Sequence, residues 1–259
     1  MDNLMGDYET IQVHLAGTLC TLQIDRPEAK NSINNRLIED CRNALQKHRD
    51  SIDILVIEGL PDVFCIGADF KEIGAGSNQV DCESINAEGL WDLWTEIATG
   101  PFVSIAHVRG GVNAGGVGFV AACDIVLASE STSFSLSELL FGLMPACVLP
   151  FLVRRIGRQK AHYMTLMTQP VSVETATEWG LVDAIAQDSE DLLRKHLLRL
   201  RRLSKQAIIR YKRYMHDLDG TLGAAKPMAL SANREVFSDQ GNLDRIARYL
   251  ETGAFPWEA

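Results

Sequence analysis

The sequence predicts an α/β fold with a helical C-terminal section. Short apolar segments alternate with amphipathic ones through the N-terminal part of the 259 residues, and only helical patterns follow. No stretch between them has the composition of a long linker, so the helical section should pack on the core or on a neighbouring subunit. The 46% hydrophobic content suits one large domain, or one with a small appendage.

The first elements in chain order are a hairpin and a capped helix. Residues 10–15 and 19–24 flank the turn Ala16-Gly17 and should pair as strands. Asn34 can cap a helix that runs to about Lys47. The next expected elements are strands at 54–58 and 63–65, a short helix at 70–73, a small, polar and mobile loop at 74–83, and a helix at 84–98 that Pro101 stops.

The central stretch, 108–128, is rich in glycine. A strand at 102–108 leads into glycines at 110, 111, 115, 116 and 118, which open a helix, and a strand at 124–128 follows. The first N–H groups of a helix have no intrahelical partner and carry the positive end of its dipole, so they can hold a developing negative charge. A tight turn that lets a helix pack against a sheet explains the same glycines.

The C-terminal part is expected to be helical. After a strand at 133–136, Ser137 begins a turn or helix. Helices are then predicted at 149–156, 159–167, 172–178, 189–203, 205–218, 225–237 and 243–252.

Bulk properties exclude several classes of protein. The net charge of −9 argues against general nucleic-acid binding, and no run of about 18 apolar residues predicts a membrane span. The N-terminus is acidic and does not resemble a signal peptide. The six cysteines lack a CxxC pair, so they indicate reduced thiols in a cytoplasmic protein and no structural metal site.

Two small-residue turns and two acids could carry chemistry. The turn Gly67-Ala68-Asp69 follows a strand and precedes a helix, so the Ala68 N–H can be free, as can that of Gly115. Two donors that converge on one thioester oxygen would form an oxyanion hole. Glu138 and Asp69 could act as acid or base if poor solvation raises their pKa. Glu138 as a surface carboxylate and Asp69 as a helix N-cap are the structural alternatives.

Several motifs together resemble the crotonase (enoyl-CoA hydratase/isomerase) superfamily. They are RPEAKN (26–31), FCIGADFKE (64–72), GGVGF (115–119) and SELLFGLMP (137–145). The resemblance implies a ClpP-like spiral of ββα units over residues 1–200 and a helical trimerisation region over 201–259, with trimers often paired into hexamers. It also implies an oxyanion hole from Ala68 and Gly115. Contacts to the coenzyme or carrier arm are implied for Glu28, Ala29, Lys30, Gly67 and Lys71.

One departure from the hydratases of this superfamily changes the expected reaction. Of their two glutamates, one matches Glu138 and the other falls on Gly118, and Ala146 replaces a usual glycine. Longer matches, including the ending YLETGAFPWE, resemble the dehydratases of polyketide β-branching cassettes. That resemblance implies loss of water from a 3-hydroxy-3-methylglutaryl thioester on an acyl carrier protein, which gives the 3-methylglutaconyl thioester without a further cofactor.

In the expected mechanism, Glu138 removes the C2 proton, and either Glu138 or Asp69 protonates the departing hydroxyl. Three alternatives remain: a hydratase of free CoA thioesters, the decarboxylase of the same cassette, and a non-catalytic binding protein of this fold. A serine protease of this fold is not expected, because no Ser, His and Asp set lies in matching elements. The basic group Arg154, Arg155, Arg158 and Lys160 could face an acidic carrier protein or only solvent.

Overall fold

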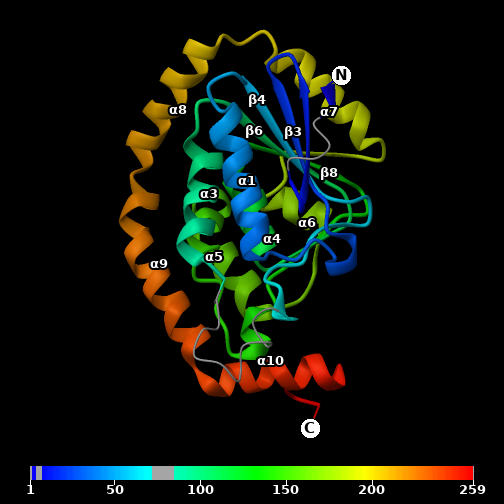
Figure 1. Ribbon diagram of the computed structural model, residues 1–259, viewed down its shortest axis with the longest axis vertical. Helices are drawn as coiled ribbons and strands as arrows, with labels where there is room; N and C mark the ends of the chain where they lie inside the picture. The colour runs from blue at the N-terminus through cyan, green and yellow to red at the C-terminus, as the bar shows by residue number, and fades with distance from the viewer. Residues whose placement is uncertain (1, 4–7, 72–84, 259) are drawn as a thin grey trace.

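The computed structural model describes residues 2–3, 8–71 and 85–258 (Figure 1). The expected loop at 74–83 lies outside these residues, as do the end of the expected helix at 70–73 and the first residue of that at 84–98. Within the described chain, strands and helices alternate up to α7, and only helices follow. The α/β class with a helical C-terminal section is therefore confirmed.

A seven-stranded sheet of order β1-β2-β3-β4-β6-β8-β11 backs the core. The expected hairpin forms, with Ile11 opposite Ile24, and the strands from β3 onward are parallel. The inner strands are covered on both faces, which explains nearly continuous apolar runs such as ILVIE in β4. The strands are β1 (Asp2–Asn3), β2 (Ile11–Ala16), β3 (Leu19–Ile24), β4 (Ile54–Glu58), β6 (Val103–Val108), β8 (Ile125–Ser129) and β11 (Ala184–Ala186).

A second sheet, of order β10-β9-β7-β5, gathers the loops of interest. Its strands are β5 (Val63–Cys65), β7 (Gly111–Asn113), β9 (Ser133–Ser135) and β10 (Val171–Ser172). Because β5, β7 and β9 are parallel, their carboxyl ends lie at one edge. Ala68, Gly115 and Glu138 each follow one of these ends, so residues distant in sequence meet there.

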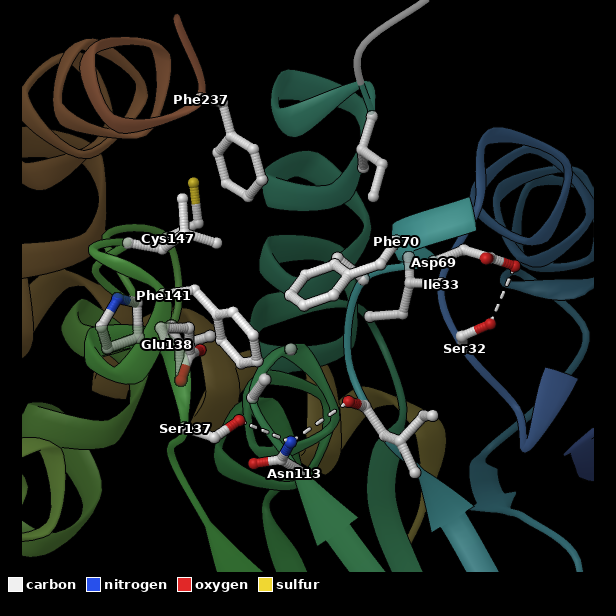
Figure 2. A pocket seen from close by; sticks show the side chains of 18 of the residues that line it. Ser32, Ile33, Asp69, Phe70, Asn113, Ser137, Glu138, Phe141, Cys147 and Phe237 are labelled. Atoms are coloured by element: carbon white, nitrogen blue, oxygen red, sulfur yellow. Dashed lines mark hydrogen bonds between the residues drawn. The ribbon is translucent and has the colours of Figure 1, made fainter. Parts of the chain in front are cut away.

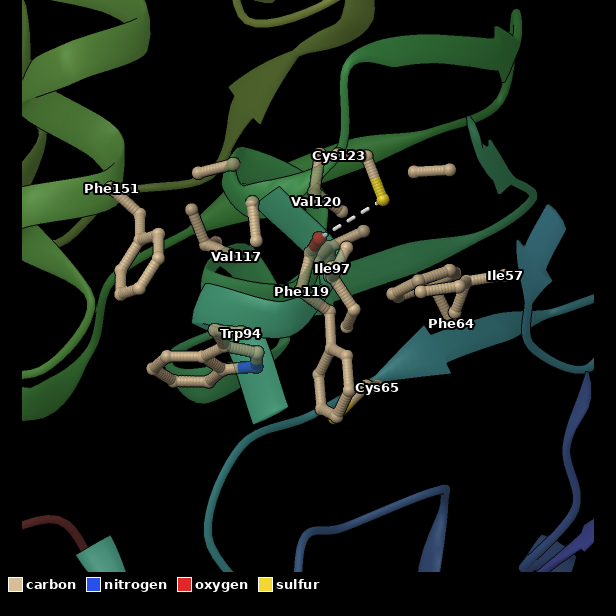
Figure 3. Packing of buried hydrophobic residues seen from close by; sticks show 14 of the residues in the cluster. Ile57, Phe64, Cys65, Trp94, Ile97, Val117, Phe119, Val120, Cys123 and Phe151 are labelled. Carbon is tan, nitrogen blue, oxygen red and sulfur yellow. Dashed lines mark hydrogen bonds between the residues drawn. The ribbon is translucent and has the colours of Figure 1, made fainter. Parts of the chain in front are cut away.

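The helix α4 (Gly115–Ala122) lies in the centre of the core, and all its residues after Gly115 are buried. Trp94 and Phe151 belong to the helices that flank it, α3 (Ala87–Thr99) and α5 (Leu149–Met167), and Trp94 contacts Phe119 edge-on at 5.8 Å (Figure 3). Other helical segments are η1 (Pro27–Ala29), α1 (Asn35–His48), η2 (Glu138–Phe141), α6 (Val173–Glu178) and α7 (Ser189–Leu200). Asn34 caps α1 as expected, accepting from the Leu37 N–H at 2.9 Å.

Three C-terminal helices wrap the core. They are α8 (Lys205–Asp219), α9 (Thr221–Ser238) and α10 (Gln240–Thr252). The first two run along one side, where α9 packs on α3 and α5, and α10 crosses the end of the molecule against η2 (Figure 1). No helix in the described ranges combines the length and the apolar character that crossing a membrane requires.

Several boundaries differ from expectation. The helices expected at 149–156 and 159–167 are confirmed as two parts of α5, separated by the non-helical Gly157 with φ of +77°. The helix α9 begins at Thr221 rather than at residue 225 and contains Pro227, which removes one backbone hydrogen bond. The short strands β7, β10 and β11 were not expected, because two or three residues are too few for a periodic pattern.

Candidate active site

A cavity of about 1040 Å³ opens at the carboxyl edge of the small sheet (Figure 2). The loops after β5, β7 and β9 supply its polar groups, which include Ala68, Gly115 and Glu138. The opposite lining is apolar and comes largely from η2, α9, α10 and the segment after α10. Its main residues are Phe70, Phe141, Leu143, Phe237, Tyr249 and Phe255. Such a cavity suits a ligand with an apolar body and one polar reacting centre.

Backbone geometry directs two N–H groups toward this cavity. Ile33 bridges the residues on either side of Ala68: its N–H donates to Gly67 at 2.7 Å, and its carbonyl accepts from Asp69 at 2.9 Å. The Ala68 N–H therefore points away from Ile33 and has no acceptor among the described residues. Gly115 begins α4, and its N–H has no intrahelical partner.

The loops that carry the two N–H groups come close together because Gly67 has no side chain. Its φ is +92°, and a Cβ there would stand 2.5 Å from the Ala114 Cβ and 3.2 Å from the Gly115 nitrogen. Ala114 itself has a φ of +50°, which turns the chain into α4. Gly67 is therefore a spacer between the two loops and does not line the cavity, which departs from its expected arm-binding role.

Glu138 supplies a poorly solvated carboxyl group to the cavity. It begins η2, and its Oε2 is buried with no hydrogen-bond partner in the described chain. Burial raises the pKa of Glu138 from 4.5 to about 7, with a smaller opposing effect from a backbone hydrogen bond. A carboxyl group with this pKa can both take and return a proton near neutral pH.

Trp94 occupies the space beside Gly118. A Cβ on Gly118 would lie 2.5 Å from Cη2 and Cζ2 of the indole, and Trp94 also lines the cavity. The described chain therefore has no room for a second carboxylate at this position. The sequence showed glycine at position 118, where a hydratase has a glutamate. It could not show that Trp94 fills that space, because no local pattern links positions 94 and 118.

Asp69 is held by other side chains. Its Oδ2 accepts from Arg26 Nη2 at 3.0 Å and from Ser32 Oγ at 2.9 Å, and its Oδ1 accepts from the Lys71 N–H at 3.2 Å. Figure 2 shows its carboxylate turned toward Ser32, on the side of the cavity away from Glu138. The contact with Lys71 N–H is that of a helix N-cap, one of the two roles expected for Asp69.

A polar chain beside Glu138 was missed in the sequence. Asn113 Nδ2 donates to Ser137 Oγ at 2.8 Å (Figure 2). Ser135 Oγ donates to Asn113 Oδ1, also at 2.8 Å. All three side chains line the cavity. The two serines alternate with Leu136 along SLSE, and this could have indicated that both serines face the same side.

Four of the five residues expected to contact the carrier arm line the cavity, and the described cysteines are buried. Glu28, Ala29, Lys30 and Lys71 line the cavity, as does Arg234, which was not expected. The five described cysteines are free and buried, and burial raises the pKa of Cys65 to about 12 and of Cys147 to about 11. Thiols with such pKa values remain protonated and are poor nucleophiles.

Arg155, in the basic group on α5, does not face a partner as the sequence had allowed. Its guanidinium donates to the carbonyls of Leu181 and Cys123 and pairs with Asp183, so it serves the fold instead of a partner. Its side chain is 11% exposed. None of Arg154, Arg155, Arg158 and Lys160 is among the residues that line the cavity.

A serine–histidine–glutamate chain does occur, but it is not the Ser, His and Asp set of a serine protease. His107 lies 3.0 Å from both Glu58 Oε2 and Ser189 Oγ. His107 and Ser189 are buried, and the chain joins β4, β6 and the start of α7, away from the residues that line the cavity. A nucleophilic serine must reach its substrate, so this chain indicates a structural link between the large sheet and α7.

Known proteins share the whole architecture. A crystal structure of a polyketide biosynthesis enoyl-CoA hydratase, PksH, from Bacillus subtilis superposes with a TM-score of 0.94 at 56% identity, covering 96% of this chain and 100% of that one. An enoyl-CoA hydratase/isomerase from Mycobacterium paratuberculosis superposes with a TM-score of 0.85 at 24% identity over 93% of this chain and 99% of that one, a likeness of fold alone. These matches confirm the expected crotonase fold.

Sequence comparison adds the class of reaction. The bacillaene synthase dehydratase PksH of Bacillus subtilis is 56% identical over 97% of both chains. A probable enoyl-CoA hydratase of Rhodobacter capsulatus is 28% identical over 94% of this chain and 93% of that one. Dehydratases and hydratases are both hydro-lyases, so this chain is an enzyme of that class. The family model for enoyl-CoA hydratase/isomerase matches residues 15–259, and the chain belongs to that family.

Proposed function

We propose that this enzyme removes water from a 3-hydroxy-3-methylglutaryl thioester on an acyl carrier protein and releases the 3-methylglutaconyl thioester for polyketide β-branching. The observation that carries the proposal is Glu138, one buried carboxyl group with a pKa of about 7 in a cavity that also holds two free N–H donors. The 56% identity to a dehydratase of bacillaene synthesis supports the direction of the reaction and the pathway.

The mechanism uses the chain's own groups in sequence. The N–H groups of Ala68 and Gly115 hydrogen-bond the thioester oxygen and stabilise the enolate that forms when Glu138 takes the C2 proton. The C3 hydroxyl then leaves as water with the proton that Glu138 returns. We assign both proton transfers to Glu138, because Asp69 already accepts from Arg26 and Ser32.

The direct test uses a carrier protein loaded with the 3-hydroxy-3-methylglutaryl group. Mass spectrometry should detect loss of one water from the loaded carrier in the presence of the enzyme. No mass change with a folded preparation would overturn the proposal. Faster turnover of the CoA thioester than of the carrier-bound one would favour the hydratase of free CoA thioesters. Release of CO₂ would favour the decarboxylase, which has no need for a C2 base such as Glu138.

Three cations are suited to the anionic parts of this substrate. Lys30, Lys71 and Arg234 line the cavity, are exposed, and lie on separate elements. We propose that they bind the phosphate of the pantetheine arm and the distal carboxylate. Replacing each with glutamine should raise KM. The residue that binds the distal carboxylate is the one whose replacement spares a substrate without that carboxylate.

We also propose a cytoplasmic trimer or hexamer assembled through residues 201–259. Large apolar side chains are exposed on α8 and α9, which supports the proposal that a neighbouring subunit covers this surface. They include Tyr211, Tyr214, Leu218 and Met228. The free cysteines support a reducing compartment. Light scattering would measure the assembly, and a monomer at micromolar concentration would contradict it.

A further inference from the structure

The amide of Asn113 has one possible orientation in its hydrogen-bond chain. Asn113 Nδ2 faces the carbonyl oxygen of Ile66 at 3.4 Å, and that oxygen can only accept. The Oδ1 atom therefore accepts from Ser135 at 2.8 Å, while Nδ2 also donates to Ser137 at 2.8 Å. A flipped amide would place Asn113 Oδ1 against the carbonyl oxygen of Ile66, so that two acceptors would face each other. The direction of the chain is thus set by a backbone group.

With the hydrogen bonds in this direction, the hydroxyl proton of Ser137 remains free to be donated. Because Ser137 Oγ accepts from Asn113, its own O–H cannot donate back to Nδ2. Ser137 also stands at the N-cap of η2, the position where serine ordinarily bonds a backbone N–H, yet it makes no such bond. In the described chain no acceptor for this proton is found. Ser137 lines the cavity and directly precedes Glu138.

The geometry points to Ser137 as the donor that holds the C3 oxygen of the substrate next to Glu138, with Asn113 as its positioning residue. The inference rests on the proposed dehydration. Trp94 excludes a carboxylate at residue 118, so a second polar group for the departing oxygen must come from elsewhere in the cavity. Ser137 is a neutral donor beside the one acid that moves protons.

The step balances without a further reactant. Glu138 takes the C2 proton, and the electron pair of that C–H bond forms the C2=C3 double bond through the enolate. The C3–O bond breaks, its electron pair stays on oxygen, and Glu138 returns the proton to this oxygen. Water leaves, Glu138 is again a carboxylate, and Ser137 keeps its own proton throughout. Its hydrogen bond strengthens as negative charge grows on the departing oxygen.

The first experiment measures recognition of the hydroxyl in enzyme that cannot turn over. In the Glu138→Gln background, calorimetry compares the pantetheine thioesters of 3-hydroxy-3-methylglutarate and of 3-methylglutarate, which lacks the hydroxyl. We expect the hydroxylated ligand to bind about three- to tenfold more tightly, the range of one neutral hydrogen bond. Adding Ser137→Ala should bring that ratio to one. A purely structural serine would weaken both ligands equally and leave the ratio intact.

The second experiment measures turnover of the loaded carrier. Ser137→Ala should lower kcat about ten- to a hundredfold with little change in KM, and Ser137→Thr, which keeps the hydroxyl, should restore most of it. Ser131→Ala is the matched control, because Ser131 is exposed and lies outside the cavity lining. An unchanged kcat in Ser137→Ala, or a ligand ratio that survives it, overturns the inference. Failure of the wild-type enzyme to lose water instead overturns the proposed function.

Discussion

The indole of Trp94 lies where a side chain on Gly118 would be, with ring carbons 2.5 Å from the position of a Cβ. Trp94 belongs to α3 and Gly118 to the buried helix α4, so the contact joins two helices in the core. Residue 118 is the expected site of the second glutamate of a hydratase. The ring of Trp94 thus fills the place where a hydratase would carry that acid, which leaves Glu138 as the proposed carrier of the proton.

Gly118→Glu should destabilise the protein and should not create a hydratase. Overpacking of this kind costs about 1–3 kcal/mol, because the indole is already packed against Phe119 and Phe151. Urea denaturation would measure the loss. Gly223→Glu is the matched control: it is also a helical glycine, but a Cβ there meets nothing within 4 Å. Equal stability of the two variants would contradict a fixed Trp94. In the double variant of Gly118→Glu and Trp94→Ala, the loss in free energy of unfolding should be smaller than the sum of the two single losses.

Dehydration should accelerate as pH rises through about 7, because Glu138 must be deprotonated to take the C2 proton. Glu138→Gln should lower kcat by about 10²–10⁴-fold and abolish this inflection. The measurement is kcat against pH on the loaded carrier. A wild-type profile that is flat from pH 5.5 to 8.5 would contradict Glu138 as the base.

The same group makes stability depend on pH. Its folded pKa of about 7 lies above the ordinary 4.5, so its contribution is fully present below 4.5 and is lost as pH rises through 7. Glu138→Gln removes that loss. The free energy of unfolding of the variant minus that of the wild type should therefore increase between pH 5 and 8. Chemical denaturation at both pH values would measure it, and an unchanged difference would contradict a buried carboxyl group.

The sequence predicted the loops of this site well, because their signals are local. A strand end followed by small residues identified Ala68 and Gly115, and the parallel order of β5, β7 and β9 brings them to one edge. The sheet order itself depends on pairing between distant segments. It could not be derived from periodicity, and resemblance to a family implied only the spiral of ββα units.

The contacts that were missed all join residues far apart in sequence. Arg26 pairs with Asp69 across 43 positions, and Asn113 meets Ser137 across 24. Neither pair leaves a periodic trace, since each joins loops or strand ends that are distant in the sequence. Residue type alone made Asp69 an acid candidate, and only its partners show that its carboxylate is already engaged.

Asp69→Asn should affect stability far more than chemistry. The Arg26–Asp69 pair is 3.0 Å long, and both side chains are about one tenth exposed, so removing one charge leaves the other poorly solvated. We expect a loss of about 3 kcal/mol and, at a temperature where the variant is folded, less than a tenfold fall in kcat. Asp191→Asn, which breaks only ion pairs at the surface, is the control and should cost far less stability. A fall in kcat as large as that of Glu138→Gln would instead make Asp69 the acid.

Gly67→Ala should separate the N–H groups of Ala68 and Gly115, the proposed oxyanion donors. Alanine at a φ of +92° is strained, and its Cβ would stand 2.5 Å from that of Ala114, which forces the loops apart. Gly17→Ala is the matched control, since its φ is also positive at +64° but no atom lies within 4 Å of the added carbon. Both variants should lose stability, but only Gly67→Ala should lose kcat, by about 10²-fold, the cost of one misplaced oxyanion donor. The measurement is kcat on the loaded carrier, with the two variants compared at equal folded fractions. Equal kcat values would contradict a role for Ala68 and Gly115 in holding the thioester oxygen.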